Sequence, residues 1–282
     1  MRQGVALPGQ RGDNFIGGTL PSLSIEMNTR ACIGTSGWSY KTWKTSFYAG
    51  VPQKDWLRFC AQRFTGIEVN ATFYRLQEKR TFERWREETP AYFRFAIKGN
   101  RFLTHNKKLA EPLPSVKLER ERAQGLGDKL SAVVWQMPHY LKKNIEKLCI
   151  FAQALQQWPE ARHALEFRHP SWFDGEVADC LHTYRLASCI SDAADWPGWD
   201  IVTTDIVYAR LHGHTRTYAS AYSGVSLKHW AKRVRTWLDE GSDVHVYFDN
   251  DAEGAAPRDA LRLIKLVDQQ KECVAASLQT RQ

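Results

Sequence analysis

The chain has 282 residues, a formal net charge of +8 and a calculated pI near 9.2. Hydrophobic residues make up 43% and charged residues 25% of it, which is typical of a soluble globular domain and excludes a chain that is disordered throughout. No apolar run is long enough to cross a membrane, and the N-terminus lacks the apolar core of a signal peptide, so we expect no membrane partner.

The N-terminal segment 1–29 is rich in Gly and Pro and has no sustained period, which predicts a flexible extension. Met27 is a second candidate start site, in which case residues 1–26 would not be translated; the alternative is a disordered arm. We expect one domain over 30–270, followed by a polar C-terminal tail over 271–282.

Short apolar runs alternate with helical patterns from residue 31 onward. The predicted strands are 31–35, 66–70, 92–98, 131–136, 163–167, 186–191, 205–211 and 243–249. The predicted helices are 53–63, 79–88, 115–126, 142–157, 174–184, 226–240 and 257–269. Eight strand and helix units favour an α/β fold of the (β/α)8 TIM type, with parallel strands and right-handed crossovers. An open doubly wound sheet is the alternative, but its Gly-rich phosphate turn is absent from the sequence.

Polar and apolar residues alternate along several of these strands. Glu68 alternates with Ile67 and Val69 in the second strand, and Arg210 and His212 share one face of the seventh. A barrel strand points alternate side chains into the lumen and toward the helices. We therefore expect the polar faces to line the lumen and to converge at the C-terminal mouth, where active sites of this fold lie.

Residues near the strand ends are the candidates for chemistry. The candidate catalytic residues are Glu68, Glu166, His212 and Asp192. The candidate substrate-binding residues are Trp38, Asn70, Tyr74, Lys98, His105, Gln136, Arg168, Arg210, Tyr247 and Asn250. Glu166 next to Arg168 stays ionised and suits an acceptor or base, although a buried pair that serves only architecture is the alternative. Lys98 suits a carboxylate or phosphate, and His105 suits proton transfer near neutral pH.

Six sequence motifs, taken together, resemble one known family. They are GTSGW at 34–38, EVNATFYR at 68–75, Lys98 with TH at 104–105, EFRHPSW at 166–172, RLHG at 210–213 and VYFDND at 246–251. Their order is similar to that of the YecE-like proteins, domain of unknown function 72, over about residues 31–268. The resemblance implies a TIM-type barrel and no assigned activity. The family usually has Asn where this chain has Asp249.

The first functional hypothesis is an enzyme of hydrolase or isomerase type that acts on a small anionic or sugar-like substrate at the mouth. Nucleic-acid binding or processing, as in endonuclease-like barrels, is the alternative, because the chain is basic and rich in aromatic rings. A barrel that serves only protein interactions is a third possibility, which the many polar lumen positions disfavour. The sequence does not determine the oligomeric state.

No cofactor motif occurs in the sequence, so we predict no cofactor. Oxygen and nitrogen ligands could come from Glu68, Glu166, Asp192, His105, His169 and His212. The nearby Lys98, Arg168 and Arg210 would repel a cation, so we predict no bound metal. The six cysteines form no C-x-x-C pair, which favours free thiols and a cytoplasmic protein.

Overall fold

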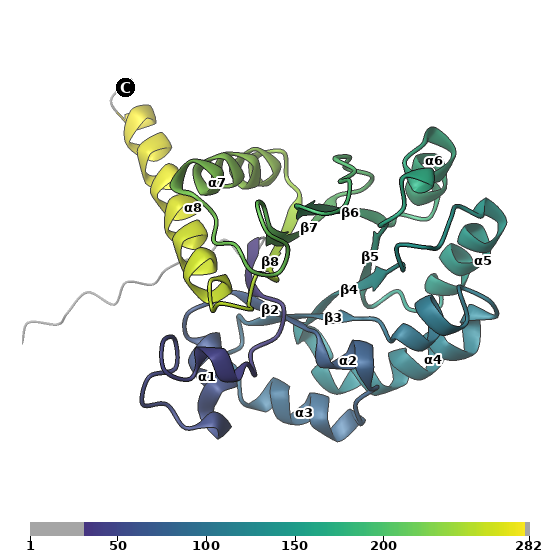
Figure 1. Ribbon diagram of the computed structural model, residues 1–282, viewed down its shortest axis with the longest axis horizontal. Helices are drawn as coiled ribbons and strands as arrows, with labels where there is room; N and C mark the ends of the chain where they lie inside the picture. Colours follow the sequence, from purple (N-terminus) through teal and green to yellow (C-terminus); the bar gives the residue numbers. More distant parts are fainter. Residues whose placement is uncertain (1–30, 280–282) are drawn as a thin grey trace, which may run out of the picture.

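The computed structural model describes residues 31–279 and contains eight parallel strands in the order β1-β8-β7-β6-β5-β4-β3-β2. The strands are β1 Ala31–Thr35, β2 Gly66–Val69, β3 Arg94–Lys98, β4 Leu130–Gln136, β5 Arg162–Glu166, β6 Ala187–Ala193, β7 Ile206–Gly213 and β8 Asp243–Phe248. Helices lie outside this ring (Figure 1). The fold is the predicted (β/α)8 barrel, and all eight strands lie within a few residues of their predicted bounds.

The helices are α1 Trp56–Ala61, α2 Ala71–Tyr74, α3 Lys79–Glu87, α4 Pro112–Ala123, α5 Ile145–Leu155, α6 Gly175–Thr183, α7 Gly224–Asp239 and α8 Ala256–Gln279. The sequence pattern missed α2, which is a single turn. The last helix extends into the predicted polar tail, and the predicted extension over 1–29 lies outside the described residues. No helix within 31–279 has the length and apolarity needed to cross a membrane.

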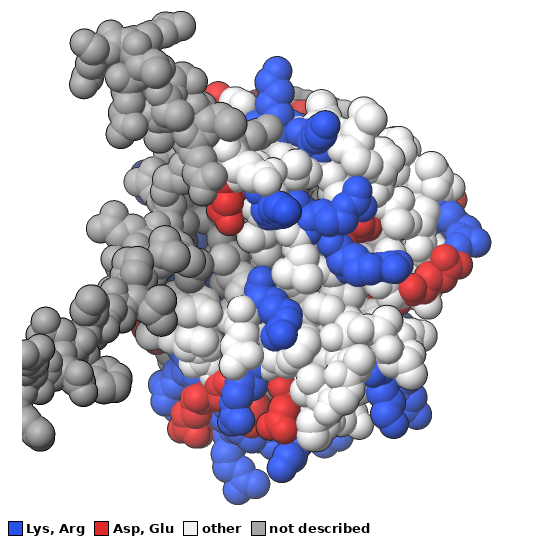
Figure 2. All heavy atoms as spheres, turned by 90° about the vertical axis from the view of Figure 1, so that its left-hand side faces the viewer, with Lys and Arg blue, Asp and Glu red and all other residues white. Residues whose placement is uncertain are grey.

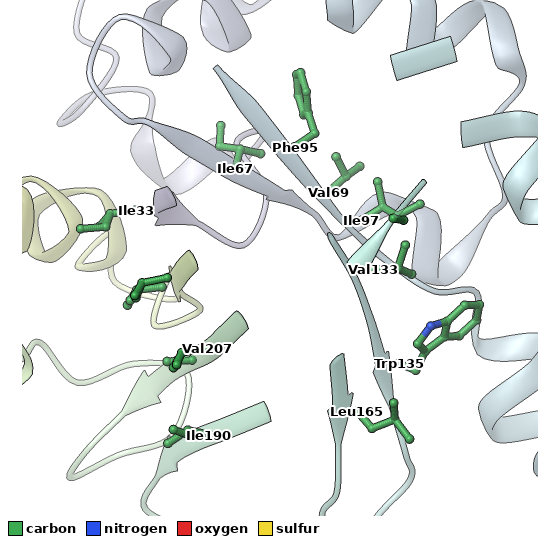
Figure 3. Close-up of a cluster of buried hydrophobic side chains, with 14 of the residues drawn as sticks. Ile33, Ile67, Val69, Phe95, Ile97, Val133, Trp135, Leu165, Ile190 and Val207 are labelled. Atoms are coloured by element: carbon green, nitrogen blue, oxygen red, sulfur yellow. The ribbon is translucent and has the colours of Figure 1, made fainter. Parts of the chain in front are cut away.

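The alternation along the strands separates two apolar clusters. One lies between the strands and the helices and includes Ile67, Val69, Ile97, Trp135 and Val207, some of which Figure 3 shows side by side. The other fills the lumen. Its members are Cys32, Ala96, Ala132, Val134, Ala164, Ala187, Cys189, Ile206, Tyr208 and Tyr247. Alternate residues do face the lumen, and Glu68 and Arg210 meet there as expected. The expectation of polar lumen faces holds only for that charged layer, because this second cluster is apolar.

Tyr247 is one predicted binding residue that lies deeper than expected. It is fully buried in the lumen cluster, and its hydroxyl lies 3.0 Å from His245 Nδ1. Its ring also packs 5.4 Å from that of Tyr208. Alternation had predicted the correct face of β8 but not the height along it, so the expected place at the rim was wrong.

The barrel closes between β1 and β2 with little regular ladder. A single bridge joins Ser36 and Glu68, and Gly37 N donates to Glu68 O over 2.7 Å. Farther down, Thr65 Oγ1 accepts from Ile33 N over 2.8 Å and donates to Ala31 O over 2.9 Å. A side chain thus replaces the backbone partner over part of this seam.

Gly34 lies at this seam, where a Cβ atom would stand 1.9 Å from the carbonyl oxygen of Gly66. Because the obstacle is backbone, we expect Gly34→Ala to lower the free energy of unfolding by about 3 kcal/mol or more. Urea unfolding followed by circular dichroism measures this. Gly175→Ala is the matched control, since a Cβ there meets nothing within 4 Å, and its effect should stay within about 1 kcal/mol. Equal stability of the two variants would contradict the close approach.

Candidate active site at the C-terminal mouth

Arg210 of β7 lies at the centre of the charged layer above the lumen cluster, and its side chain is fully buried. Its Nη2 donates to Glu68 Oε1 over 2.8 Å and to Asp249 Oδ2 over 2.9 Å, and Nε donates to Glu68 Oε2 over 3.0 Å. Its Nη1 donates to Glu166 Oε2 over 2.8 Å. One guanidinium thus binds three carboxylates, and all of its nitrogens are engaged.

Further hydrogen bonds occupy the remaining acceptor positions of Glu68 and Glu166. Tyr208 donates its hydroxyl to Glu68 Oε2 over 2.7 Å, and Ser36 donates to Glu68 Oε1. Glu166 Oε1 accepts from Ser191 Oγ over 3.2 Å and from Arg168 Nε and Nη2 over 3.1 and 3.0 Å. Buried carboxylates need such partners, because an unpaired charge in the interior is strongly unfavourable.

His212 lies beside the same carboxylates. Its Nε2 is 3.2 Å from Glu166 Oε1, and its Nδ1 is 3.1 Å from Asp249 Oδ2. The rings of Trp196 and Tyr218 stand against the imidazole, with centroids 5.0 and 5.5 Å away. His212 is fully buried, so it lies under an aromatic cover.

Glu166, Asp249 and Arg210 stay ionised because Arg210 pairs with both carboxylates. Burial alone would raise the pKa of Glu166, but Arg168, Arg210 and His212 together hold that pKa well below its usual range. The pKa of Asp249 is lowered to about 2, mainly by Arg210 acting against burial, with further help from His212. Burial works against the charge of Arg210, yet the carboxylates raise its pKa well above the usual value.

Lys98, at the end of β3, is the cation of this layer that lacks a carboxylate partner. Only 5% of it is exposed, and Nζ lies 4.2 Å from the ring centroid of Phe73. Nζ makes no hydrogen bond or ion pair with any residue in the described part of the chain. Burial and the charge of Arg210 lower its pKa to about 8, against the opposite influence of the carboxylates.

Phe73 also gathers two other side chains of the mouth. The His105 ring meets it edge-on at 5.1 Å, and the Arg101 guanidinium lies 5.8 Å from its centroid. His105 belongs to a π-helical turn, Phe102–Asn106. Its Nδ1 is hydrogen-bonded to Thr104 Oγ1, with 2.9 Å between the two atoms. Burial and then the charges of Arg101, Lys98 and Arg168 lower its pKa to about 4. The imidazole is therefore neutral at pH 7.

Three predicted binding residues lie together in a separate cleft beside the mouth. Trp38, Asn70 and Tyr74 line a cavity of about 620 Å³ between the loop after β1 and the helices α2 and α3. Trp38 packs edge-on against Trp85 at 5.2 Å. These residues are grouped as expected, but they face this cleft and not the Arg210 cluster.

Asp192 lies apart from the other predicted catalytic residues. Its carboxylate contacts His214 Nδ1 at 3.1 Å and accepts from Trp230 Nε1 over 3.2 Å. It lines a cavity of about 570 Å³ between β6 and α7, together with Trp199 and Arg233. The predicted gathering of Asp192 with Glu68 and Glu166 was wrong, because Asp192 shares the helix-facing side of β6 with Ile190, whereas Ser191 on the lumen side contacts Glu166.

The remaining predicted binding residues are Gln136 and Asn250. Gln136 is buried at the end of β4, in register with Glu166. Asn250 donates from Nδ2 to Ser220 O over 2.9 Å and to Asp259 Oδ2 over 3.0 Å. Asn250 is thus engaged in holding the loop after β7 to α8.

Sequence reasoning did not select several members of the site. They are Ser36, Phe73, Ser191, Trp196, Tyr208, Tyr218 and Asp249. The alternation that pointed to Arg210 also places Tyr208 on the lumen face, and Asp249 follows from the same rule on β8. Trp196 and Tyr218 come from loops, for which the sequence carried no comparable signal.

Clusters that could hold a metal ion are absent from the part of the chain that the structure describes, counting groups of three or more His, Cys, Asp and Glu. In the charged layer, the Arg210 guanidinium occupies the space between the carboxylates.

The comparisons with known proteins agree with this fold. The family model described as "Protein of unknown function DUF72" matches residues 32–282. The chain belongs to the DUF72 family. A curated relative, UPF0759 protein YunF of Bacillus subtilis, is 25% identical to this DUF72 chain over 244 residues, which is 75% of the chain and 86% of the relative.

Two solved structures of DUF72 proteins also match. That of Thermotoga maritima has a TM-score of 0.75 and 26% identity, and covers 84% of this chain and 99% of its own. That of Enterococcus faecalis has a TM-score of 0.73 and 19% identity, and covers 84% and 95%. The second likeness concerns the fold alone. The family is uncharacterised, so the function of this DUF72 barrel has to be argued from its site.

Replacement of Arg210 tests the charged layer. We expect Arg210→Met to lower the free energy of unfolding by about 3 to 5 kcal/mol, because three buried carboxylates lose their shared partner. Arg216→Met is the control, since its ion pair with Glu253 is on the surface and should contribute less than about 1 kcal/mol. Urea unfolding of both variants measures the difference, and similar values would refute the central role of Arg210.

Glu119 of α4 supports the segment that follows Lys98. Its carboxyl accepts from Asn100 N over 3.1 Å, and Asn100 Nδ2 donates to Thr72 O over 2.8 Å. Thr72 Oγ1 in turn lies 2.7 Å from Lys98 O. Burial raises the pKa of Glu119 to about 8, against the smaller influence of the Asn100 amide, so this side chain is protonated at pH 7.

A raised carboxyl pKa has a definite effect on stability. Between the usual Glu value and about 8, the folded chain holds a proton that the unfolded chain has lost, so stability falls as pH rises, by up to about 1.4 kcal/mol per pH unit. Glu119→Gln keeps the acceptor and should remove this slope. Urea midpoints from pH 5 to 9 check it, with the exposed Glu121→Gln on the same helix as control. The idea fails if Glu119→Gln and the parent show the same pH profile.

Proposed function

We propose that this DUF72 chain is an enzyme that acts on a small anionic substrate at the C-terminal mouth, by proton transfer of isomerase or hydrolase type. The observation that carries the proposal is the state of Lys98. It is buried in a charged layer, yet its amine makes no hydrogen bond or ion pair with the side chains described over residues 31–269 and lies only against the Phe73 ring. A structural lysine in such a place would normally be paired.

The charges around Lys98 support an anionic ligand. Glu68, Glu166 and Asp249 are bound to Arg210, while Arg168 makes a further pair with Glu166. Lys98 and Arg101 thus remain at the Phe73 side of the mouth as cations without a carboxylate among the described residues. A carboxylate or phosphate group of a substrate would supply that partner.

The same side chains suit proton transfer. A lysine with a pKa of about 8 can change its protonation state near neutral pH, which general acid and base catalysis requires. Neutral His105, against the same Phe73 ring, can give or take a second proton. In this proposal Glu68, Glu166 and His212 keep the charged layer in place and set its field, while Lys98 meets the substrate.

Nucleic-acid binding has less support from the surface. Many of the arginines outside the lumen are paired with acids, among them Arg120 with Glu160 and Arg233 with Asp200. Figure 2 shows Lys and Arg dispersed over one face, with acidic residues between them at its lower edge. Affinity for phosphate backbones is typically built on a continuous basic stripe.

A metabolite screen tests the proposed function. The full chain is incubated with an extract of small metabolites, and changes are followed by mass spectrometry. We expect an anionic compound to be converted by the parent and by the control Lys117→Met, whose lysine is exposed on α4, and its conversion to fall by at least about a hundredfold in Lys98→Met. Conversion unaffected by Lys98→Met, or no anionic compound converted, counts against the proposal.

A further inference from the structure

Among residues 31–269, two lysines are buried, and they differ in their contacts. Lys129 is 7% exposed, and its Nζ donates to Arg86 O and Thr89 O over 2.6 Å each and to Thr89 Oγ1 over 3.1 Å. All three of its donors are used. Lys98 is 5% exposed and has only the face of Phe73 beneath its amine. Burial alone therefore does not explain the free amine of Lys98.

The strand end that carries Lys98 is firmly held, although the amine is not. Thr72 Oγ1 contacts both Val69 O and Lys98 O at 2.7 Å, which ties β2 to β3. The next turn is fixed through Asn100 by Thr72 and Glu119. A rigid backbone with an uncommitted amine is the arrangement expected of a nucleophile, whose position is set by its support and whose lone pair stays available.

We propose that Lys98 Nζ forms an imine with the carbonyl carbon of a small compound that also bears a carboxylate or phosphate group. This inference rests on the proposed function, because it places the carbonyl substrate at that same mouth. Arg101, which has no carboxylate partner among the described residues, lies 5.8 Å from the same Phe73 ring and is the cation available for the anionic group. The reaction needs no oxidant or further reactant.

The bonds and protons balance as follows. The neutral Nζ attacks the carbonyl carbon, the C–N bond forms, and the carbonyl electron pair moves to oxygen, which takes the first of the two Nζ protons; the second leaves with the hydroxyl in the next step. The resulting carbinolamine loses its hydroxyl with a proton as water, and a C=N bond remains. His105 can accept the proton from Nζ and return it to the leaving hydroxyl. The lowered pKa of Lys98 supports the first step, since only the neutral amine attacks.

Reductive trapping tests the imine on the full chain. The probes are pyruvate, dihydroxyacetone phosphate and formaldehyde, each with sodium cyanoborohydride, and modified lysines are located by peptide mass spectrometry. We expect Lys98 to be modified about tenfold faster than exposed Lys117 by formaldehyde and by at least one anionic probe. Buried Lys129 is an internal control and should remain unmodified.

Each other outcome has a meaning. Formaldehyde labelling of Lys98 no faster than that of Lys117 overturns the imine, and labelling by formaldehyde without either anionic probe overturns the substrate class. Lys98→Arg preserves the positive charge but cannot form an imine. It serves as a second variant in case Lys98→Met fails to fold, and near-ultraviolet circular dichroism checks its own fold. If Lys98→Arg still converts an anionic compound, the imine fails while the proposed function stands.

Discussion

A single buried guanidinium organises the charged layer of this barrel. Arg210 joins acids from β2 and β5 and the residue after β8, so that four strand ends meet at one side chain. Taking these ions out of water is unfavourable, and the cost is offset only when every charge has its partners. Removing any one of these charges would leave another buried without a partner. The residue types at the four strand ends are therefore constrained together.

This arrangement divides the mouth into two parts. On one side, Arg210, Glu68, Glu166, Asp249 and His212 satisfy one another beneath aromatic rings. On the other side, Lys98, Arg101 and His105 surround Phe73 with few mutual bonds. The first part commits the carboxylates that could otherwise have paired with Lys98. The amine of Lys98 is thus free because these carboxylates pair with Arg210.

The sequence was sufficient to predict the barrel and most members of the charged layer. Alternation has a period of two residues, so it assigns Glu68, Glu166 and Arg210 to the lumen with little ambiguity. It says nothing of height along the barrel, which is why Tyr247 was placed at the rim although it packs with Tyr208. On β6 the same rule places Asp192 with Ile190 on the helix-facing side, so the alternation itself argued against a place for Asp192 in the cluster.

Loop residues were the least predictable. Phe73 lies on α2, a helix too short for a hydrophobic period to be recognised, and it nevertheless provides the surface on which Lys98 rests. Trp196 and Tyr218 contact His212 from loops whose course depends on tertiary contacts. Such positions carry no local pattern, because their neighbours in space are distant in sequence.

The seam between β1 and β2 uses two residues that also bind Arg210, the uncharged Ser36 and the carboxylate Glu68. Ser36 and Glu68 form the bridge that closes the ring, and both bind the guanidinium. The same two residues therefore close the sheet into a ring and bind the buried charge at its centre. A shift of β2 by one residue would turn Glu68 outward and undo both together, so the shear of this barrel is fixed by charge as well as by backbone pairing.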